Sequence, residues 1–402
     1  MKPARVVGAG LSGLAAAWCL SGAGFDVEVV EASAHPGGLI ETLSTRHGPV
    51  ERAANAFVWT ETTERWFRAI GVRPEFPLPA SRRRFIFRNG RARRWPLGPI
   101  ETLGMGARLG ATWARRGFAP RVDETVAAWG RRVVGRAATS ALVGPGLQGV
   151  YAAPPDRLSA SVIFGERRRG RTVSAAPRGG MGELIEKLYA ALVARGVTFA
   201  FGRSIDALDP ATPTVICTNA PAAAALVKPH APALGAAIAA VPMNRMVTAT
   251  AFFEPRLDDL HGFGVLFTRD SGVEALGALF NTDIFVDRGA DRSETWIYGS
   301  IDPAAPLPSD TDLAARLEHD REILTGQRRS PVAVFWTRRV PALPIYSAAI
   351  DDVRRRIGDL PPWLALAGNY LGRLGVAKLL DVAADASARL GGATSPESRA
   401  RA

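Results

Sequence analysis

The sequence predicts an α/β protein, with a parallel sheet built from distant parts of the chain, an α+β domain and a small helical insertion. Three observations lead to this fold class. Residues 4–38 follow a pattern of strand, glycine-rich turn, helix and strand, and the apolar run Leu364–Leu366 indicates one more buried strand. Residues 243–300 hold several short alternating patterns that indicate a second, β-rich domain. Residues 97–165 lack such alternation and indicate short helices.

The glycine-rich turn has the spacing of a dinucleotide-binding fingerprint. A short apolar run leads into Gly8-Ala9-Gly10-Leu11-Ser12-Gly13, and an Ala/Leu-rich helical segment follows. Gly8 permits the tight turn, Gly10 lets the backbone approach a pyrophosphate, and Gly13 lets the helix pack closely on the sheet. We expect the phosphates at the helix N-terminus, where free N–H groups and the dipole favour negative charge.

An acidic residue at the end of the second strand supports this interpretation. Glu31 closes the strand 26–30, and its carboxylate can accept a hydrogen bond from a ribose 2′-hydroxyl, which favours an unphosphorylated adenosine. A second match to the glycine pattern, Gly144–Gly149, is rejected as a cofactor loop. Pro145 lacks an N–H group, and residues 150–155 do not open a helix.

Composition and charge narrow the class of protein further. The chain has 402 residues, which allows two or three domains, and its two cysteines, Cys19 and Cys217, give no disulfide framework. No apolar run of about 18 residues exists to span a membrane. The first strand begins near Arg5, which leaves no room for a signal peptide, so we expect a cytoplasmic protein. The net charge of +12 is interpreted mainly as coding bias. The segment 82–95 is interpreted as a β-hairpin rather than a nucleic-acid surface.

We expect three domains and a tail. The dinucleotide-binding domain takes 1–75, 166–235 and 356–390, the substrate domain takes 76–96 and 236–355, the helical insertion takes 97–165, and 391–402 is a disordered tail. The expected helices are 63–70, two that start near Ile100 and Asp123, 183–195, 310–324 and 376–390. Besides 26–30 and 364–366, the expected strands are 197–201, 214–218, 246–253, 264–267, 275–280 and 295–298, with a hairpin in 80–96.

A pair of glycines after Glu31 indicates which dinucleotide is bound. Gly37-Gly38 resembles the pair that flavoproteins of the glutathione-reductase-like and amine-oxidase-like class carry. This resemblance implies FAD. No second credible fingerprint exists for a nicotinamide cofactor, and no cysteine follows Cys217 to tether the flavin, so we expect FAD to be non-covalent.

Segments along almost the whole chain resemble the protoporphyrinogen/coproporphyrinogen oxidase family, of which this chain would be a short, divergent member. Departures include Ala53-Ala54 in place of the family's Gly-Pro. The segments that carry the resemblance are Glu51–Phe57, Arg83–Ile86 with Asn89-Gly90 and Trp95–Leu97, Gly149–Ala153 with Leu158–Ala160, Gly262–Leu266, Leu276–Phe280, Gly368–Tyr370 and Gly375–Ala377.

The resemblance implies a reaction and a set of site residues. The reaction is the oxidation of protoporphyrinogen IX or coproporphyrinogen III by hydride transfer to the flavin, with oxygen as acceptor, in haem or tetrapyrrole biosynthesis. Arg84 would bind a propionate, and Leu266 and Phe280 would sandwich the macrocycle. The reaction requires no side-chain nucleophile and no metal, and no catalytic side chain is assigned. His47 is interpreted as a surface or core residue rather than a flavin contact. The expected FAD contacts are Gly8, Gly10, Leu11, Ser12, Gly13, Glu31, Ala32, Gly37, Gly38, Asn55, Gly368, Asn369, Gly375, Val376 and Ala377.

Alternatives stay open at this point. A flavin amine oxidase or polyene desaturase can share the fold, although residues 229–377 contain no lysine, which counts against an amine oxidase. A non-catalytic flavoprotein partner is the other alternative. Besides the tetrapyrrole substrate, we expect peripheral contact with anionic membrane, because 97–165 resembles the family's membrane-facing region and carries Arg115, Arg116, Arg131 and Arg132. A homodimer is neither indicated nor excluded.

Overall fold

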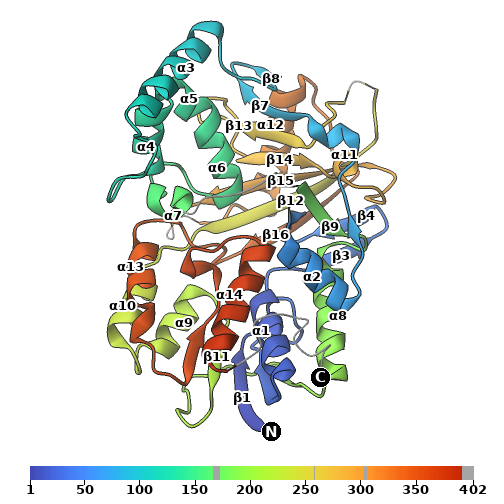
Figure 1. Cartoon of the computed structure of the whole chain (residues 1–402). Coiled ribbons are helices and arrows are strands. Elements are labelled where there is room, and N and C mark those ends of the chain that lie inside the picture. Colours follow the sequence, from blue (N-terminus) through green and yellow to red (C-terminus); the bar gives the residue numbers. More distant parts are fainter. Residues whose placement is uncertain (166–172, 258, 303–305, 392–402) are drawn as a thin grey trace.

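The computed structural model describes residues 1–165, 173–257, 259–302 and 306–391, which form two sheet-based layers and a helical lobe (Figure 1). The arginine cluster 167–171 and nearly all of the expected tail lie outside these residues. The two termini of the described chain both belong to the parallel-sheet layer.

The first layer is a five-stranded parallel sheet in the order β10-β2-β1-β11-β17. Its glycine turn connects β1 to a helix, and its last strand comes from the end of the chain, as the sequence predicts. The strands are β1 (Lys2–Val7), β2 (Phe25–Val30), β10 (Thr198–Ala200), β11 (Thr214–Ile216) and β17 (Leu364–Leu366).

Helices cover both faces of this sheet. The adjacent strand residues Val6 and Val7 point to opposite faces, and each belongs to a different hydrophobic cluster. One face is covered by α1 (Leu11–Gly22), α2 (Glu61–Ile70), α8 (Met181–Ala194) and α14 (Val376–Arg389), and the other by α9 (Ala220–Val227), α10 (Pro232–Ala239) and α13 (Ala349–Arg356). The sequence-based boundaries at 235 and 356 assign half of α10 and most of α13 to the substrate domain, but both helices pack on the parallel sheet.

The second layer is a seven-stranded sheet in the order β16-β12-β15-β14-β13-β7-β8. All neighbours are antiparallel except β13 and β7. Helix α12 (Asp310–Thr325) covers one face through Leu313 and Leu317. The strands are β7 (Arg84–Arg88), β8 (Arg91–Arg93), β12 (Arg245–Phe253), β13 (Gly264–Phe267), β14 (Gly277–Phe280), β15 (Arg292–Ser300) and β16 (Ala333–Arg339).

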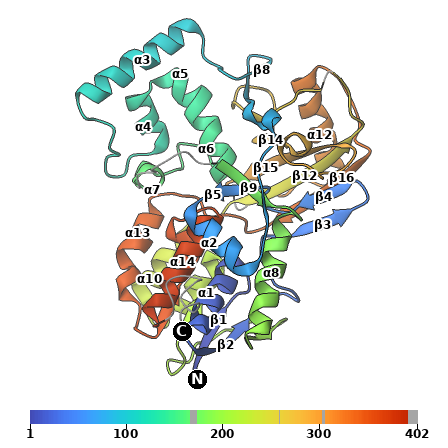
Figure 2. The ribbon, with the colours of Figure 1, turned by 45° about the vertical axis from the view of Figure 1, so that its right-hand side comes forward.

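The helical lobe stands beside this sheet (Figures 1 and 2). It holds α3 (Pro99–Ala114), α4 (Val126–Val133), α5 (Arg136–Ala138), a π-helical turn (Thr139–Val143), α6 (Gly144–Tyr151) and α7 (Ala160–Phe164). The second glycine pattern, 144–149, lies within α6 and follows no strand, so its rejection as a cofactor loop is confirmed. Among the helices of the described residues, none is long and apolar enough to cross a membrane.

Small elements join the layers. Strands β3 (Thr42–Thr45) and β4 (Gly48–Glu51) form a hairpin, and β5 (Phe57–Trp59), β9 (Val173–Pro177) and β6 (Pro74–Glu75) form a three-stranded sheet. The short helix α11 (Asn281–Ile284) follows β14, and single 3-10 turns occur at Pro79–Arg82, Ile357–Asp359 and Asn369–Leu371.

Candidate functional site

The turn between β1 and α1 depends on three glycines in three different ways. Gly8 has a φ of +104°, which favours glycine. A Cβ atom on Gly13 would lie 1.8 Å from the carbonyl oxygen of Gly8, so a side chain there would prevent the turn from closing. A Cβ atom on Gly10 would meet only the Cα of Gly38, at 3.9 Å. Gly10 therefore faces open space, where a ligand can approach the backbone.

A second glycine stretch runs beside the first. Gly37 donates a hydrogen bond from its N–H to the carbonyl oxygen of Ala9 at 2.9 Å, and Gly10 and Gly37 form an isolated parallel bridge. Gly38 has a φ of +61°, and a Cβ atom there would lie 3.2 Å from the Cα of Gly10. The two stretches together form a trough without side chains, defined by Gly10, Gly37 and Gly38, where a pyrophosphate can approach the backbone.

Two helix N-termini are free to bind phosphate. Helix α1 begins after Gly10 and helix α14 begins after Gly375, and neither has a side-chain cap or an acidic residue in its first turn. Their first N–H groups are left for a ligand. Helix α8 also begins after a glycine, but Glu51 accepts from the Met181 N–H at 2.9 Å and Thr42 accepts from the Gly182 N–H at 2.7 Å. Unlike the start of α8, the starts of α1 and α14 thus keep backbone N–H groups for a ligand, and these two helices pack against each other.

Glu31 is held at the end of β2 beside the glycine turn. Its carboxylate accepts hydrogen bonds from the N–H groups of Ala9 at 2.6 Å and Ser33 at 2.8 Å. Two backbone donors fix its orientation, and a carboxylate keeps further lone pairs for a ribose hydroxyl. Ala32, the next residue, is exposed.

The closing loop lies between β17 and α14. Asn369 accepts a hydrogen bond at its carbonyl oxygen from the Tyr346 hydroxyl at 2.9 Å, which anchors the loop to the chain before α13. Tyr370 is fully buried, and its own hydroxyl has no hydrogen-bond partner among the described residues. Burial raises the pKa of Tyr370, so this hydroxyl stays neutral. Val376 and Ala377 begin α14.

A buried polar cluster connects the two layers near Asn55. The Arg288 Nη1 lies 3.2 Å from the Glu51 Oε1, and the side chains are only 5% and 3% exposed, respectively. Burial raises the pKa of Glu51, while hydrogen bonds from Thr42 and Met181 and the nearby Arg288 oppose that shift. Asn55, Glu51, Asn281 and Arg288 line a cavity of about 10 Å³, which is room for one water.

Two buried polar atoms of this cluster, Asn281 Oδ1 and Arg288 Nη2, have no partner among the described residues. Sequence reasoning placed Glu51 and Asn55 in a motif but missed both Asn281 and Arg288. No local pattern identifies either residue, because each meets the cluster through contacts between distant segments.

The seven-stranded sheet separates two residues that we expected to act together. Leu266 pairs with Gly277, and Leu279 pairs with Gly264, so Leu266 and Leu279 project from the same face. Phe280 projects from the other face, where it is 1% exposed in the core beneath α12. The expected sandwich of Leu266 and Phe280 is therefore wrong, since the sheet stands between their side chains. Leu279, which packs against the core of the parallel-sheet layer, is the residue of this pair that shares the face of Leu266.

Arg84 lies on the same sheet face as Leu266. Its strand pairs in parallel with β13, with Arg84 opposite Gly264. The guanidinium is exposed and sits 4.2 Å from the centre of the Phe263 ring. His47, in contrast, lies in the turn between β3 and β4, where its Nδ1 is 2.8 Å from the Asp291 carboxylate and its ring packs on Phe252.

Comparisons with known proteins follow this geometry. A family model described as flavin-containing amine oxidoreductase matches residues 11–259. The mitochondrial protoporphyrinogen oxidase of Nicotiana tabacum is 25% identical, over 96% of this chain and 94% of that protein. The coproporphyrinogen III oxidase of Propionibacterium freudenreichii is 24% identical, over 92% of this chain and 87% of that protein. A structure from Exiguobacterium, of a protein proposed to be a protoporphyrinogen oxidase, has a TM-score of 0.77 at 19% identity and covers 95% of this chain and 97% of its own.

Proposed function

Because this chain belongs to the family of flavin-containing amine oxidoreductases, we propose that it binds FAD without a covalent link and oxidises a porphyrinogen to the porphyrin. A flavin-dependent oxidoreductase needs a place for the pyrophosphate and a surface that presents the substrate to the flavin. The trough at Gly10 and Gly38 and the free ends of α1 and α14 fit the first requirement.

The observation that carries the substrate proposal is the shared sheet face of Arg84, Leu266 and Leu279. Porphyrinogens combine an apolar macrocycle with carboxylate side chains. The exposed Arg84 guanidinium can bind a carboxylate through two parallel hydrogen bonds, while the two leucines offer apolar surface to the ring system. Relatives that match almost the whole chain act on protoporphyrinogen or coproporphyrinogen, which supports this substrate class.

The chemistry divides between cofactor and protein. A bound flavin supplies the hydride acceptor, with oxygen as the acceptor that reoxidises it. Arg84 binds and orients the substrate by one carboxylate, and Leu266 and Leu279 exclude water from the apolar ring. The reaction itself requires no side-chain nucleophile.

Anaerobic mixing tests the reaction against its alternatives. Oxidised holoenzyme is mixed in separate experiments with protoporphyrinogen IX, coproporphyrinogen III, a primary amine and a polyene, and flavin absorbance is followed. We expect one porphyrinogen to bleach the flavin and to yield fluorescent porphyrin when air is admitted. If only the amine or only the polyene bleaches the flavin, that compound class, and not the porphyrinogens, is the substrate class. A flavin that dithionite reduces, but none of the four substrates does, would indicate a non-catalytic partner.

We also propose peripheral binding to anionic membrane through helix α3. Three large apolar side chains of this helix, Ile100, Leu103 and Trp113, are 87%, 76% and 75% exposed. Arg115 and Arg116 directly follow the helix and are exposed. Apolar side chains beside cations suit the boundary between lipid headgroups and acyl chains.

Arg132, one of the arginines that we expected at the membrane, makes its contacts within the protein. Arg132 donates to the Glu124 carboxylate at 2.6 Å and to the carbonyl oxygens of Gly117 and Ala119, so it secures the loop after α3. The expectation that Arg132 meets lipid is therefore wrong, and Arg131, which is exposed, is left with Arg115 and Arg116.

A further inference from the structure

A pocket of about 360 Å³ lies on the α12 side of the seven-stranded sheet, opposite the face of Arg84 and Leu266. Its apolar wall is formed by Phe85, Leu260 and Leu324, and its polar wall by Arg83, Asp259 and His261. This volume lies in the range of small-molecule sites. Arg83 and Arg84 are adjacent in the chain, but Arg83 lines this pocket whereas Arg84 lies on the opposite face of the sheet.

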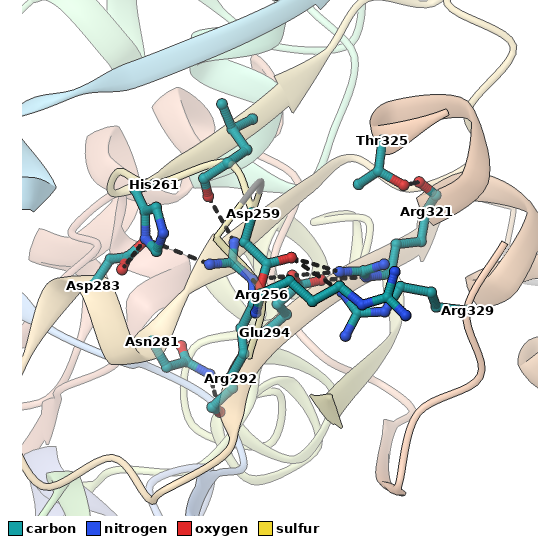
Figure 3. A network of polar contacts seen from close by, with 12 residues as sticks. Arg256, Asp259, His261, Asn281, Asp283, Arg292, Glu294, Arg321, Thr325 and Arg329 are labelled. Atoms are coloured by element: carbon teal, nitrogen blue, oxygen red, sulfur yellow. Dashed lines mark hydrogen bonds and ion pairs between the residues drawn. The ribbon is translucent and has the colours of Figure 1, made fainter. Parts of the chain in front are cut away.

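The inner polar wall is a neutral ion-pair network (Figure 3). Asp259 is 6% exposed and contacts Arg329 at 3.1 Å and Arg321 at 3.6 Å. Glu294 contacts Arg292 at 2.6 Å and Arg321 at 3.2 Å, and Arg292 also lies 3.7 Å from Asp283. The three carboxylates of Asp259, Asp283 and Glu294 balance the three guanidiniums of Arg292, Arg321 and Arg329. The network therefore adds no net charge to the pocket.

Arg83 supplies an unbalanced positive charge. Its side chain is exposed, and within the described residues it has no ion pair and no side-chain hydrogen bond. A small anionic group in the pocket can therefore pair with this guanidinium, whose planar fork matches the geometry of a carboxylate.

His261 supplies a hydrogen-bond acceptor. Its Nδ1 lies 2.9 Å from the Asp283 carboxylate, which also accepts the Gly262 N–H at 3.0 Å (Figure 3). Because a carboxylate accepts, Nδ1 carries a proton, and in the tautomer with its single proton on Nδ1 the lone pair of Nε2 can accept from a ligand. The His261 side chain is 49% exposed, so this nitrogen is accessible at the pocket.

We propose that this pocket is a second ligand site, which binds a flat, hydroxylated aromatic carboxylate. Arg83 pairs with the carboxylate, His261 accepts from the hydroxyl, and Phe85, Leu260 and Leu324 cover the rings. The pocket and the proposed substrate surface lie on opposite faces of the sheet. Occupancy here can therefore be measured whether or not the proposed reaction occurs.

Fluorescence titration of the holoenzyme with 6-hydroxy-2-naphthoate tests the site. We expect one saturable equivalent, at least tenfold weaker binding of the uncharged 6-hydroxy-2-naphthamide, and at least tenfold weaker binding of the naphthoate to Arg83→Gln. Arg82→Gln, which changes an exposed neighbour outside the pocket, and Arg84→Gln should change the affinity less than twofold. Ala92→Phe should fill the pocket and abolish binding, with circular dichroism as the check on folding.

The hydroxyl is tested by a cycle of ligand and protein changes. Removing the hydroxyl (2-naphthoate) should weaken binding to the natural chain but change nothing further in His261→Phe. Absence of saturable binding, equal binding of the amide, or loss of binding in Arg84→Gln but not in Arg83→Gln would each overturn the proposal. Full binding to Ala92→Phe would also overturn it.

Discussion

The carboxylate of Glu51 and the guanidinium of Arg288 meet at 3.2 Å between the two layers, although 236 residues separate them along the chain. Glu51 also holds the first turn of α8 through the Met181 N–H, and Arg288 comes from the loop after α11. One buried ion pair thus connects a hairpin, a helix end of the parallel-sheet layer and a loop of the substrate layer.

Glu51→Gln should destabilise the protein strongly, because it leaves the buried Arg288 guanidinium without the carboxylate that it contacts. We expect a loss of about 3–5 kcal/mol in the free energy of unfolding, measured by denaturant titration. The double variant Glu51→Gln/Arg288→Met should recover part of the loss. Arg269→Gln breaks a pair with Asp156 whose side chains are 62% and 57% exposed, and it should cost less than about 1 kcal/mol. Equal losses from both single changes would contradict this account.

Gly10→Val should abolish flavin binding and leave the apoprotein folded. The open space at Gly10 accommodates a side chain only in the absence of a pyrophosphate. Gly13→Ala should instead prevent folding, since its Cβ would lie 1.8 Å from the Gly8 carbonyl oxygen. Acid-released FAD measures the first effect and thermal unfolding the second. Retention of flavin by Gly10→Val would remove the trough from the binding site.

Arg84→Ala should weaken substrate binding without loss of flavin. The removal of one charge-assisted pair costs about 1–3 kcal/mol, which corresponds to a KM higher by about tenfold to a hundredfold. Arg82→Ala, two residues before Arg84 and also exposed, is the matched control and should leave KM unchanged. An unaltered KM in Arg84→Ala, in an otherwise active enzyme, would assign the carboxylate to another residue.

Leu279→Ala and Phe280→Ala should affect different properties, because the two side chains leave the sheet on opposite faces. Phe280→Ala should cost about 3–5 kcal/mol of stability by opening a cavity in the core under α12. Leu279→Ala should chiefly raise KM. A larger rise of KM in Phe280→Ala, at temperatures where both variants are folded, would restore Phe280 as the substrate contact.

Membrane binding should depend on two separable parts of α3 and the residues after it. Leu103→Asn/Trp113→Asn should reduce co-flotation with liposomes at every salt concentration. Arg115→Gln/Arg116→Gln should reduce it only at low salt and only for anionic liposomes. If neutral and anionic liposomes bind the natural chain equally, the arginines have no role in binding.

The sequence predicted best what is fixed locally. The turn at Gly8–Gly13 sits between a short strand and a helix, and each of its glycines has a nearby physical reason, so both the parallel sheet and the helix N-terminus could be inferred. Strand β17 was found because the apolar run Leu364–Leu366 fits a strand buried on both faces.

Features that depend on strand register or on contacts between distant segments could not be predicted from the sequence. Leu279 and Phe280 are adjacent, and only the pairing of β14 with β13 decides which of them faces the other layer. Strand β16, which lies at a sheet edge, was not predicted from the sequence. Most of its residues are half-buried, so apolar and polar side chains do not alternate clearly along this strand. Glu51 lies in a recognisable segment, but nothing in the sequence near Glu51 or near Arg288 indicates that the two residues pair.

The position of β17 in the parallel sheet has a consequence for biosynthesis. This strand and α14 come from residues 364–389, yet they pair with β11 and pack on α1 near the start of the chain. The first βαβ unit therefore emerges from the ribosome long before the strand and helix that complete its layer. Until then, the apolar faces of α1 and β11 need temporary protection, either from the nascent chain itself or from a chaperone. Closure of the cofactor-binding layer, with its high contact order, therefore waits until residues 364–389 have been synthesised.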